Sequence, residues 1–272
     1  MGESNYLAIT TVKGELEAML CWLDSFLRDN DIKYTIMSGT LLGAVRHGGF
    51  IPWDDDIDIG LLRSDYEKLL QVAKNYQDSK YEFQGFEING MGRPFLKLIN
   101  RHIAVAAEGE ADKYLWIDIF PFDGVPDAFS NIYQFYFHKV IRNLRSTKNA
   151  DVFAQAMQKQ KNPFKRLYNY VLRCILPHHS EDDVTRIIIE QAKKVDIDKC
   201  ANIEDIVWGM KKFPKCCMDE MTDYKFETIT VRGMKDYDTY LKCIYGDYMK
   251  LPPEEQRVNH GIKAWRVVED EE

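Results

Sequence analysis

The stretch Ile51-Pro52-Trp53-Asp54-Asp55-Asp56-Ile57-Asp58-Ile59-Gly60 sets four carboxylates within five residues of an otherwise largely apolar segment. Side chains alternate between the two faces of an extended chain, so we expect Asp54, Asp56 and Asp58 on one face and Asp55 on the other. Successive carboxylates on that face would be about 7 Å apart at their Cα atoms and would repel one another. A divalent cation relieves such repulsion at neutral pH, and hard oxygen ligands suit Mg²⁺ or Mn²⁺. The alternative, a solvated acidic turn, is less consistent with the apolar neighbours.

The residues before this run have the features of a phosphate site. Lys33–Met37 is expected as a short strand, and Thr40–Arg46 as a short helix that ends at His47-Gly48-Gly49. Between them, Ser38-Gly39 would let the backbone approach a ligand closely, and the helix N-terminus would offer N–H groups to an anion. Ser38 and Thr40 add hydroxyl donors. A phosphate bound there would lie close to a metal ion on the acidic strand.

Two charged residues lie inside apolar segments that we expect to be strands. Asp118 is the charge within Tyr114–Phe120, and a lone buried carboxylate is costly unless it is paired or metal-bound. We therefore take Asp118 as a third carboxylate of the metal site, reached from a neighbouring strand. Lys97 within Phe95–Asn100 is either paired with a substrate phosphate or an aspartate, or is an edge-strand lysine that blocks aggregation. Asp123-Gly124 is expected to be the turn that ends the second strand.

The rest of the chain mixes helical and strand patterns. Apolar spacings of three and four predict helices at Thr10–Asn30, Asp65–Tyr76 and Tyr237–Tyr245, and a largely helical region over 128–212. Further strands are expected at Tyr81–Asn89, Ile103–Ala107 and Phe226–Val231.

The segment Pro163–Leu176 is basic and amphipathic, because Lys165, Arg166 and Arg173 are interspersed with tyrosines and leucines. One interpretation is a helix that packs on the core. The other is a surface helix that makes peripheral contact with an anionic membrane. We favour packing on the core.

Composition narrows the class of protein. A net charge of −7 over 272 residues argues against a nucleic-acid binder with a broad basic surface. No uninterrupted apolar run reaches the roughly 18 residues of a membrane span, and the first residues lack the pattern of a signal peptide. The six cysteines include no CxxC pair, which fits reduced thiols. We therefore expect a cytoplasmic protein, with the inner face of the cell membrane as the place of any peripheral contact.

Two long motifs carry a family resemblance. The runs Ser38–His47 and Phe50–Asp58 closely resemble the signature of the LicD family, bacterial phosphocholine transferases that are related to fukutin and fukutin-related protein. The similarity extends to Asp65-Tyr66, to Ile117–Pro121, and to Tyr245-Gly246-Asp247 with Pro252-Pro253. It implies an α+β fold of the nucleotidyltransferase type, a small mixed sheet flanked by helices with a mostly helical C-terminal elaboration. We expect a catalytic core at 1–125, and a helical elaboration at 126–272 whose last segment packs back on the core.

The resemblance also implies roles for residues. Ser38, Gly39 and Thr40 match the turn that binds the donor phosphates. Asp56 and Asp58 match the paired ligands of Mg²⁺ or Mn²⁺, with Asp54 just before them. The third carboxylate is matched by Asp118, which would bind a second metal or act as general base. Arg46, His47 and Lys97 are candidates for phosphate contacts.

The implied reaction is transfer of phosphocholine from CDP-choline to a sugar hydroxyl, with release of CMP. The acceptor would be a lipid-linked or nucleotide-linked glycan precursor, typically of teichoic acid. The choline ammonium would need an aromatic cage, whose members the sequence leaves open.

Three alternatives stay open from the sequence. The same fold could transfer another CDP-activated alcohol phosphate, such as ribitol phosphate. A DxD glycosyltransferase would give Ser38-Gly39 no role and would have a longer nucleotide-binding half before the acidic run. A non-catalytic binding protein on this fold would be expected to have lost a carboxylate, whereas Asp54, Asp56, Asp58 and Asp118 are all present.

Overall fold

The computed structural model describes residues 6–90, 92–106, 113–128, 157–158, 160–175, 180–205, 211–257, 259 and 261–267. Its strands are β1 (Thr35–Ile36), β2 (Asp58–Leu62), β3 (Tyr81–Gln84), β4 (Leu96–Ala106), β5 (Tyr114–Val125), β6 (Asn202–Glu204), β7 (Phe213–Pro214), β8 (Met221–Phe226), β9 (Ile229–Met234) and β10 (Lys263–Arg266). Its helices are α1 (Ile9–Asp29), α2 (Ser38–His47), α3 (Arg63–Ala73), α4 (Phe86–Asn89), α8 (Pro163–Ile175), α9 (Glu181–Lys193) and α10 (Tyr237–Tyr245).

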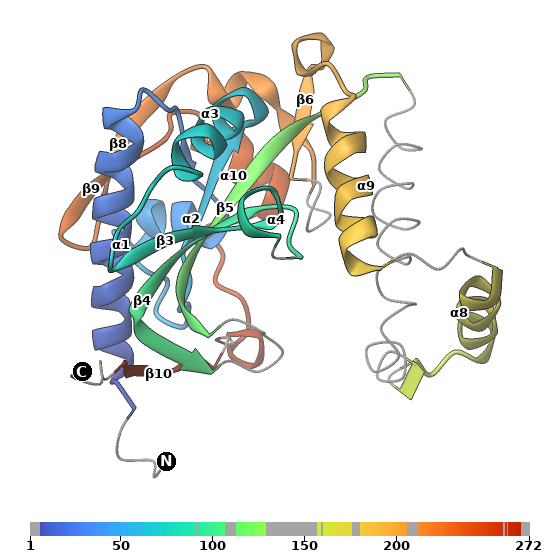
Figure 1. The fold of residues 1–272 in the computed structure, drawn as a ribbon, viewed down its shortest axis with the longest axis horizontal. Helices are drawn as coiled ribbons and strands as arrows, with labels where there is room; N and C mark the ends of the chain where they lie inside the picture. Colours follow the sequence, from blue (N-terminus) through green and yellow to red (C-terminus); the bar gives the residue numbers. More distant parts are fainter. Residues whose placement is uncertain are drawn as a thin grey trace.

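The strands form a mixed sheet with the order β10-β4-β5-β2-β1-β9-β8. β2 runs parallel to β5 and β1 parallel to β9, whereas β1–β2, β4–β5 and β8–β9 are antiparallel. β3 and β10 pair with different halves of β4, and β6 joins the end of β5 (Figure 1). The structure is thus α+β, with a mixed sheet and flanking helices, as the sequence predicts.

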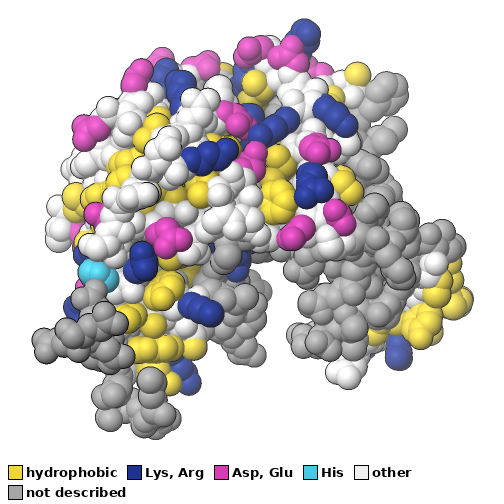
Figure 2. All heavy atoms as spheres, viewed as in Figure 1, with side chains coloured by type: hydrophobic (Ala, Val, Ile, Leu, Met, Phe, Trp, Pro, Cys, Tyr) yellow, Lys and Arg dark blue, Asp and Glu magenta, His cyan; other side chains and the backbone are white. Residues whose placement is uncertain are grey.

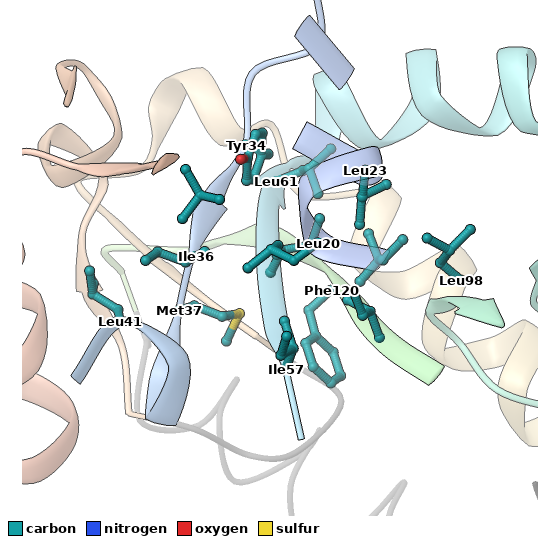
Figure 3. Close-up of a cluster of buried hydrophobic side chains, with 14 of the residues drawn as sticks. Leu20, Leu23, Tyr34, Ile36, Met37, Leu41, Ile57, Leu61, Leu98 and Phe120 are labelled. Carbon is teal, nitrogen blue, oxygen red and sulfur yellow. The ribbon is translucent and has the colours of Figure 1, made fainter. Parts of the chain in front are cut away.

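Helix α1 supplies much of the core on one side of the sheet. Its apolar positions recur every three or four residues, so Leu16, Leu20, Leu23 and Leu27 form one buried stripe. Figure 3 shows Leu20 and Leu23 in one cluster with sheet residues such as Ile36, Ile57 and Leu61. This packing buries the apolar face of β2, which is the face opposite to Asp58.

Aromatic rings fill the other side of the sheet and lead toward α2. Phe122 of β5 contacts Phe213 with ring centroids 5.1 Å apart, and Phe213 contacts Tyr240 of α10 at 4.8 Å. The first ring lies so close to Gly60 of β2 that a Cβ there would collide with it. Close approach of two strands and a ring therefore requires glycine at this position.

Two of the predicted strand boundaries in this region are wrong. The strands expected at Phe95–Asn100 and Ile103–Ala107 are one strand, β4, with an irregularity between Asn100 and Ala104. β5 continues through Asp123-Gly124 instead of turning there. The reason is remote in sequence: Arg63 donates to both carboxylate oxygens of buried Asp123, at 2.7 and 2.6 Å.

Two other predicted strands are each divided in the structure. Of the strand predicted at Tyr81–Asn89, only Tyr81–Gln84 is β3, and Phe86–Asn89 is the single helical turn α4. The strand predicted at Phe226–Val231 spans the turn of a hairpin between β8 and β9. Glu227 adopts a left-handed φ of 53° there, and its carboxylate accepts from the Phe50 amide at 2.9 Å, so contact with another loop stabilises the turn.

The region expected to be helical over 128–212 is described only in part. α8 and α9 agree with the prediction, β6 does not, and residues 129–156 and 206–210 lie outside the described residues. α8 does not bury its apolar face as we favoured, because Phe164, Leu167 and Tyr168 are 81%, 65% and 57% exposed. The division into 1–125 and 126–272 stays a prediction, although β8, β9 and β10 of the second part join the sheet.

Candidate active site

Three charged side chains lie side by side across the middle of the sheet. Asp58 of β2 is in register with Asp118 of β5, and Asp118 is in register with Lys97 of β4. Cross-strand partners share a face, so the three side chains are neighbours. Lys97 Nζ is 3.1 Å from Asp118 Oδ1, and both residues are buried. Because β4 has strands on both sides, Lys97 is not an edge-strand lysine.

Trp116 completes the surroundings of Asp118. It lies two residues earlier on β5, and its Nε1 donates to Asp118 Oδ2 at 3.2 Å. Lys97 Nζ is 4.1 Å from the centroid of the same ring, a cation–π contact. The sequence analysis missed Trp116 as a site residue, although its spacing from Asp118 is the signal for a shared face.

The acidic run leaves a turn at Pro52-Trp53 and reaches this row without regular secondary structure. β2 begins only at Asp58, yet burial alternates before it: Asp55 and Ile57 are buried, whereas Asp54, Asp56 and Asp58 are partly exposed. The predicted separation of Asp55 from the other three is therefore present. Thr40 Oγ1 accepts a hydrogen bond of 2.9 Å from the Asp58 amide, which ties α2 to the start of β2.

The first turn of α2, Ser38–Thr40, has a constrained backbone. Ser38 has φ of 48°, a left-handed value that is uncommon for a residue with a side chain and is typical of functional sites. Its amide donates to the Tyr240 hydroxyl at 3.1 Å, so the aromatic packing from Phe122 ends at this turn. Tyr240 was not among the predicted site residues, since nothing in its helical pattern separates it from a core residue.

This turn presents backbone donors that are unpaired within the described residues. The Gly39 and Thr40 amides make no hydrogen bond there, and the buried Ser38 hydroxyl lies beside them, near Tyr240. A Cβ at Gly39 would collide with the Asp54 carboxylate, so the turn and the acidic run touch here. An anion bound to these donors would therefore lie beside the carboxylates.

The carboxylates are short of positive charge. Burial raises the pKa of Asp58 well above the ordinary range of an aspartate, and Asp56, Asp118 and Asp54 raise it further. Burial also raises the pKa of Asp118, while Lys97 acts in the opposite direction. Arg93 also acts to lower the pKa of Asp118, and Lys13 lies near Asp54 and Asp55. The pKa values of Asp58 and Asp118 are raised all the same, so an added cation would favour their ionised forms.

Two further groups face the acidic cluster. Asp205, buried just after β6, also raises the pKa of Asp58. It was not among the predicted site residues, because Glu204 directly before it hides the pattern of a lone charge in an apolar run that identified Asp118. Partial burial raises the pKa of Tyr245, which stays 44% exposed, and nearby Tyr240, Asp58 and Asp54 add to that effect. The end of α10 therefore lies at the acidic cluster.

A cavity of about 500 Å³ opens next to the turn. Gly39, Arg46, Trp53, Asp54 and Tyr245 line it, together with residues of the segment 247–256. Arg46 Nη1 donates to the Tyr248 carbonyl at 2.6 Å, which connects α2 to that segment. His47 does not line the cavity, and its ring contacts Trp53 with centroids 6.3 Å apart.

Asp56, Asp58 and Asp118 are the residues that could hold a metal ion. Their carboxylate oxygens are the donors that Mg²⁺ and Mn²⁺ prefer. Burial and then the neighbouring carboxylates raise the pKa of Asp58, and a bound cation would act in the opposite direction. As placed in the described residues, however, no group of three His, Cys, Asp or Glu side chains converges as in a formed metal site. The assignment of a metal ion to these three residues therefore rests on the chemistry of their carboxylate oxygens.

Comparison with known proteins identifies the domain. Residues 31–156 match the family described as LicD/FKTN/FKRP, nucleotidyltransferase domain. These residues are a LicD-family domain. The lipopolysaccharide cholinephosphotransferase LicD of Haemophilus influenzae is 28% identical over 241 residues, which are 85% of this chain and 88% of that protein. The resemblance inferred from the sequence is confirmed, and the match supports a phosphotransferase enzyme.

Two further relatives match over shorter stretches of the chain. An uncharacterized protein of Rickettsia prowazekii is 53% identical over 55 residues, 20% of this chain and 21% of that protein. The human ribitol 5-phosphate transferase FKRP is 38% identical over 55 residues, 20% of this chain and 11% of that protein. Within the residues that the structure describes, none of the helices has the length and apolar character needed to cross a membrane.

Replacing Asp58 by Asn is expected to stabilise the free protein near neutral pH, by on the order of 1 kcal/mol. Because the pKa of Asp58 is higher in the folded state than in the unfolded state, stability falls as pH rises through the interval between the two values. Asparagine does not ionise, so the variant should not lose stability over this pH interval. Chemical unfolding of both proteins between pH 4 and pH 8 measures the difference in the free energy of unfolding.

The stability gained by Asp58→Asn should shrink toward about pH 4, where aspartate begins to protonate in the unfolded chain as well. Asp198→Asn, whose side chain is 92% exposed, is the control and should change little at any pH. A destabilised Asp58→Asn protein at pH 8 would contradict this account of the cluster.

Proposed function

We propose that this protein transfers phosphocholine from CDP-choline to a hydroxyl group of a cell-surface glycan precursor and releases CMP. The observation that carries the proposal is the in-register pair Asp58 and Asp118 beside the Ser38–Thr40 turn. That arrangement sets anion-binding donors next to a cluster of carboxylates, which suits a diphosphate bound with a cation. The cholinephosphotransferase name of the Haemophilus influenzae relative supports choline as the cargo.

Mg²⁺ or Mn²⁺ is the proposed cofactor, held by Asp56, Asp58 and Asp118. When bound, such an ion supplies positive charge that neutralises the diphosphate and the charge developing on the leaving CMP. Asp54 contacts Gly39 of the turn, so its carboxylate would border both the ion and the donor phosphates.

The chain's own residues bind the donor and move one proton. The Ser38 hydroxyl and the amides of Gly39 and Thr40 donate to the diphosphate, with Arg46, which lines the cavity, as a further contact to phosphate. His47 does not line that cavity, so it is the weaker of the two predicted phosphate contacts. The acceptor oxygen forms its bond to the phosphorus of the phosphocholine group as the bond to the CMP oxygen breaks. Asp118 takes the acceptor's proton, or binds a second metal ion. Lys97 holds Asp118 in position and favours its ionised, basic form.

For the acceptor we propose a sugar hydroxyl on a lipid-linked or nucleotide-linked precursor, with a teichoic acid precursor as the first choice. The relative from Haemophilus influenzae is named for lipopolysaccharide, which is also a surface glycan. A second candidate cargo is ribitol phosphate from CDP-ribitol, favoured by the match to ribitol 5-phosphate transferase FKRP. A glycosyltransferase and a non-catalytic protein fit less well, since neither uses the turn and the complete acidic cluster together.

We further propose that the protein is cytoplasmic and makes peripheral contact with the membrane through α8. Phe164, Leu167, Tyr168 and Val171 recur every three or four residues and are all exposed, and Figure 2 shows apolar side chains over this helix. The segment 163–175 contains three basic residues and no acidic one, although the whole chain carries −7. An exposed apolar face beside basic residues fits an anionic lipid surface.

The activity prediction concerns which nucleotide is released. With Mg²⁺ and an acceptor glycan, the protein should release CMP from CDP-choline faster than from CDP-ribitol, and no UMP or UDP from UDP-sugars. Asp58→Asn and Asp118→Asn should each lower the rate by about 10²-fold or more, while the surface variant Asp198→Asn keeps it. Nucleotide chromatography measures the products. Release of UMP or UDP, or no CMP from any CDP donor, would overturn the proposed function.

The membrane prediction concerns vesicle binding. The protein should float with vesicles that contain phosphatidylglycerol and not with pure phosphatidylcholine vesicles. Phe164→Ser/Leu167→Ser should abolish flotation, and Lys165→Glu/Arg166→Glu should weaken it. Val267→Ser, an exposed apolar residue outside α8, is the control. Equal flotation of the Phe164→Ser/Leu167→Ser variant would exclude α8 as the contact.

A further inference from the structure

The cavity beside the Ser38–Thr40 turn has the chemistry of a site for an organic cation. We propose that its part lined by Trp53, Asp54 and Tyr245 binds the quaternary ammonium group of the donor's choline. The inference rests on the proposed function and adds the residues that would make the enzyme specific for choline.

The position of the cavity meets a strict requirement of the substrate. In phosphocholine, only one oxygen and two carbons separate phosphorus from nitrogen, so the ammonium site must adjoin the phosphate site. Gly39, whose amide lacks a partner within the described residues, also lines the cavity. A phosphocholine group held at the turn can therefore extend its ammonium directly into this space.

Trp53 supplies an aromatic face that already contacts a cation. The Arg257 guanidinium carbon lies 5.0 Å from the centroid of the Trp53 ring, and Arg257 Nε donates to the Pro252 carbonyl at 2.9 Å. A trimethylammonium group has no N–H to donate, so proteins recognise it with aromatic faces and nearby negative charge. Trp53 provides such an aromatic face at the wall of the cavity.

Tyr245 and Asp54 supply the second aromatic face and the negative charge. Tyr245 comes from the end of α10, and the nearby Asp58, Asp54 and Asp56 are among the groups that influence its hydroxyl. Asp54 lies next to Trp53 in sequence and touches Gly39. Leu251 and Pro252 add an apolar surface suited to the N-methyl groups.

The cavity also contains positive charge, which fits the other half of the ligand. Arg46 and Lys250 line it together with Asp54 and Asp247. Phosphocholine is a zwitterion. A cavity lined by both basic and acidic side chains matches it when the basic groups face the phosphate and the carboxylates face the ammonium. A cytosine ring could also stack on Trp53, but an uncharged base gains little from the carboxylates; this rival is an outcome of the test.

The experiment compares binding of the cation with binding of the nucleotide. Isothermal titration with CDP-choline and with CMP is done for wild type, Trp53→Leu, Trp53→Phe and Tyr245→Leu. Trp53→Leu and Tyr245→Leu should each weaken CDP-choline by about tenfold, and Trp53→Phe by less, because phenylalanine keeps an aromatic face. CMP binding should stay within about twofold of wild type, since CMP lacks the ammonium. Trp265→Leu, a tryptophan outside the cavity, is the matched control.

The outcomes separate this inference from the proposed function. Equal weakening of CDP-choline and CMP would overturn it in favour of a cytosine site, and unchanged CDP-choline binding would overturn it outright. Circular dichroism identifies a variant that fails to fold, and the other cavity variant then decides. Absence of CMP release from every CDP donor would defeat the proposed function itself, whereas normal release with unaltered affinities defeats only the cavity assignment.

Discussion

Asp58 and Asp118 are held side by side by the hydrogen bonds of two parallel strands, and the protein supplies only part of the charge that this proximity demands. Lys97 pairs with Asp118, while Asp54 and Asp56 extend the negative charge along the chain before β2. A cluster of this kind costs stability in the free protein. We interpret the cluster as a binding site for a cation and for the anionic substrate that the cation accompanies.

Distant parts of the chain converge on this cluster. α10 begins some two hundred residues after Ser38, yet Tyr240 accepts from the Ser38 amide, at a sequence separation of 202 residues. Arg46 reaches the Tyr248 carbonyl from the other side. Tyr240 and Tyr248 lie outside residues 31–156, which match the family, so the site uses more of the chain than the matched domain. The relative from Haemophilus influenzae, aligned over 85% of the chain, is consistent with this.

Local patterns were enough to predict the alternating burial of the acidic run, the start of α2 and the buried carboxylate Asp118, although only Asp58 of the acidic run lies in β2. The alternation of Asp54 to Asp58 is a property of any extended chain, and burial of a single charge is visible from its neighbours. The register that sets Asp58 against Asp118 could not be predicted, because parallel pairing joins segments about sixty residues apart. Asp123 was mistaken for a turn residue for a similar reason, since its partner Arg63 is remote. Glu227 lies in the turn of a hairpin, within a run of strand-forming residues. The feature that reveals this turn is its contact with Phe50, which is remote in sequence.

The central claim is that the pair Asp58 and Asp118 is built for a divalent cation. Thermal unfolding of the wild-type protein with increasing Mn²⁺, without substrate, tests it most directly, because a ligand that binds the folded state raises Tm in a saturable way. The account predicts such a rise for wild type and none for Asp58→Asn, which lacks the charge that attracts the ion. An unchanged wild-type Tm, or an equal rise in the variant, would contradict it.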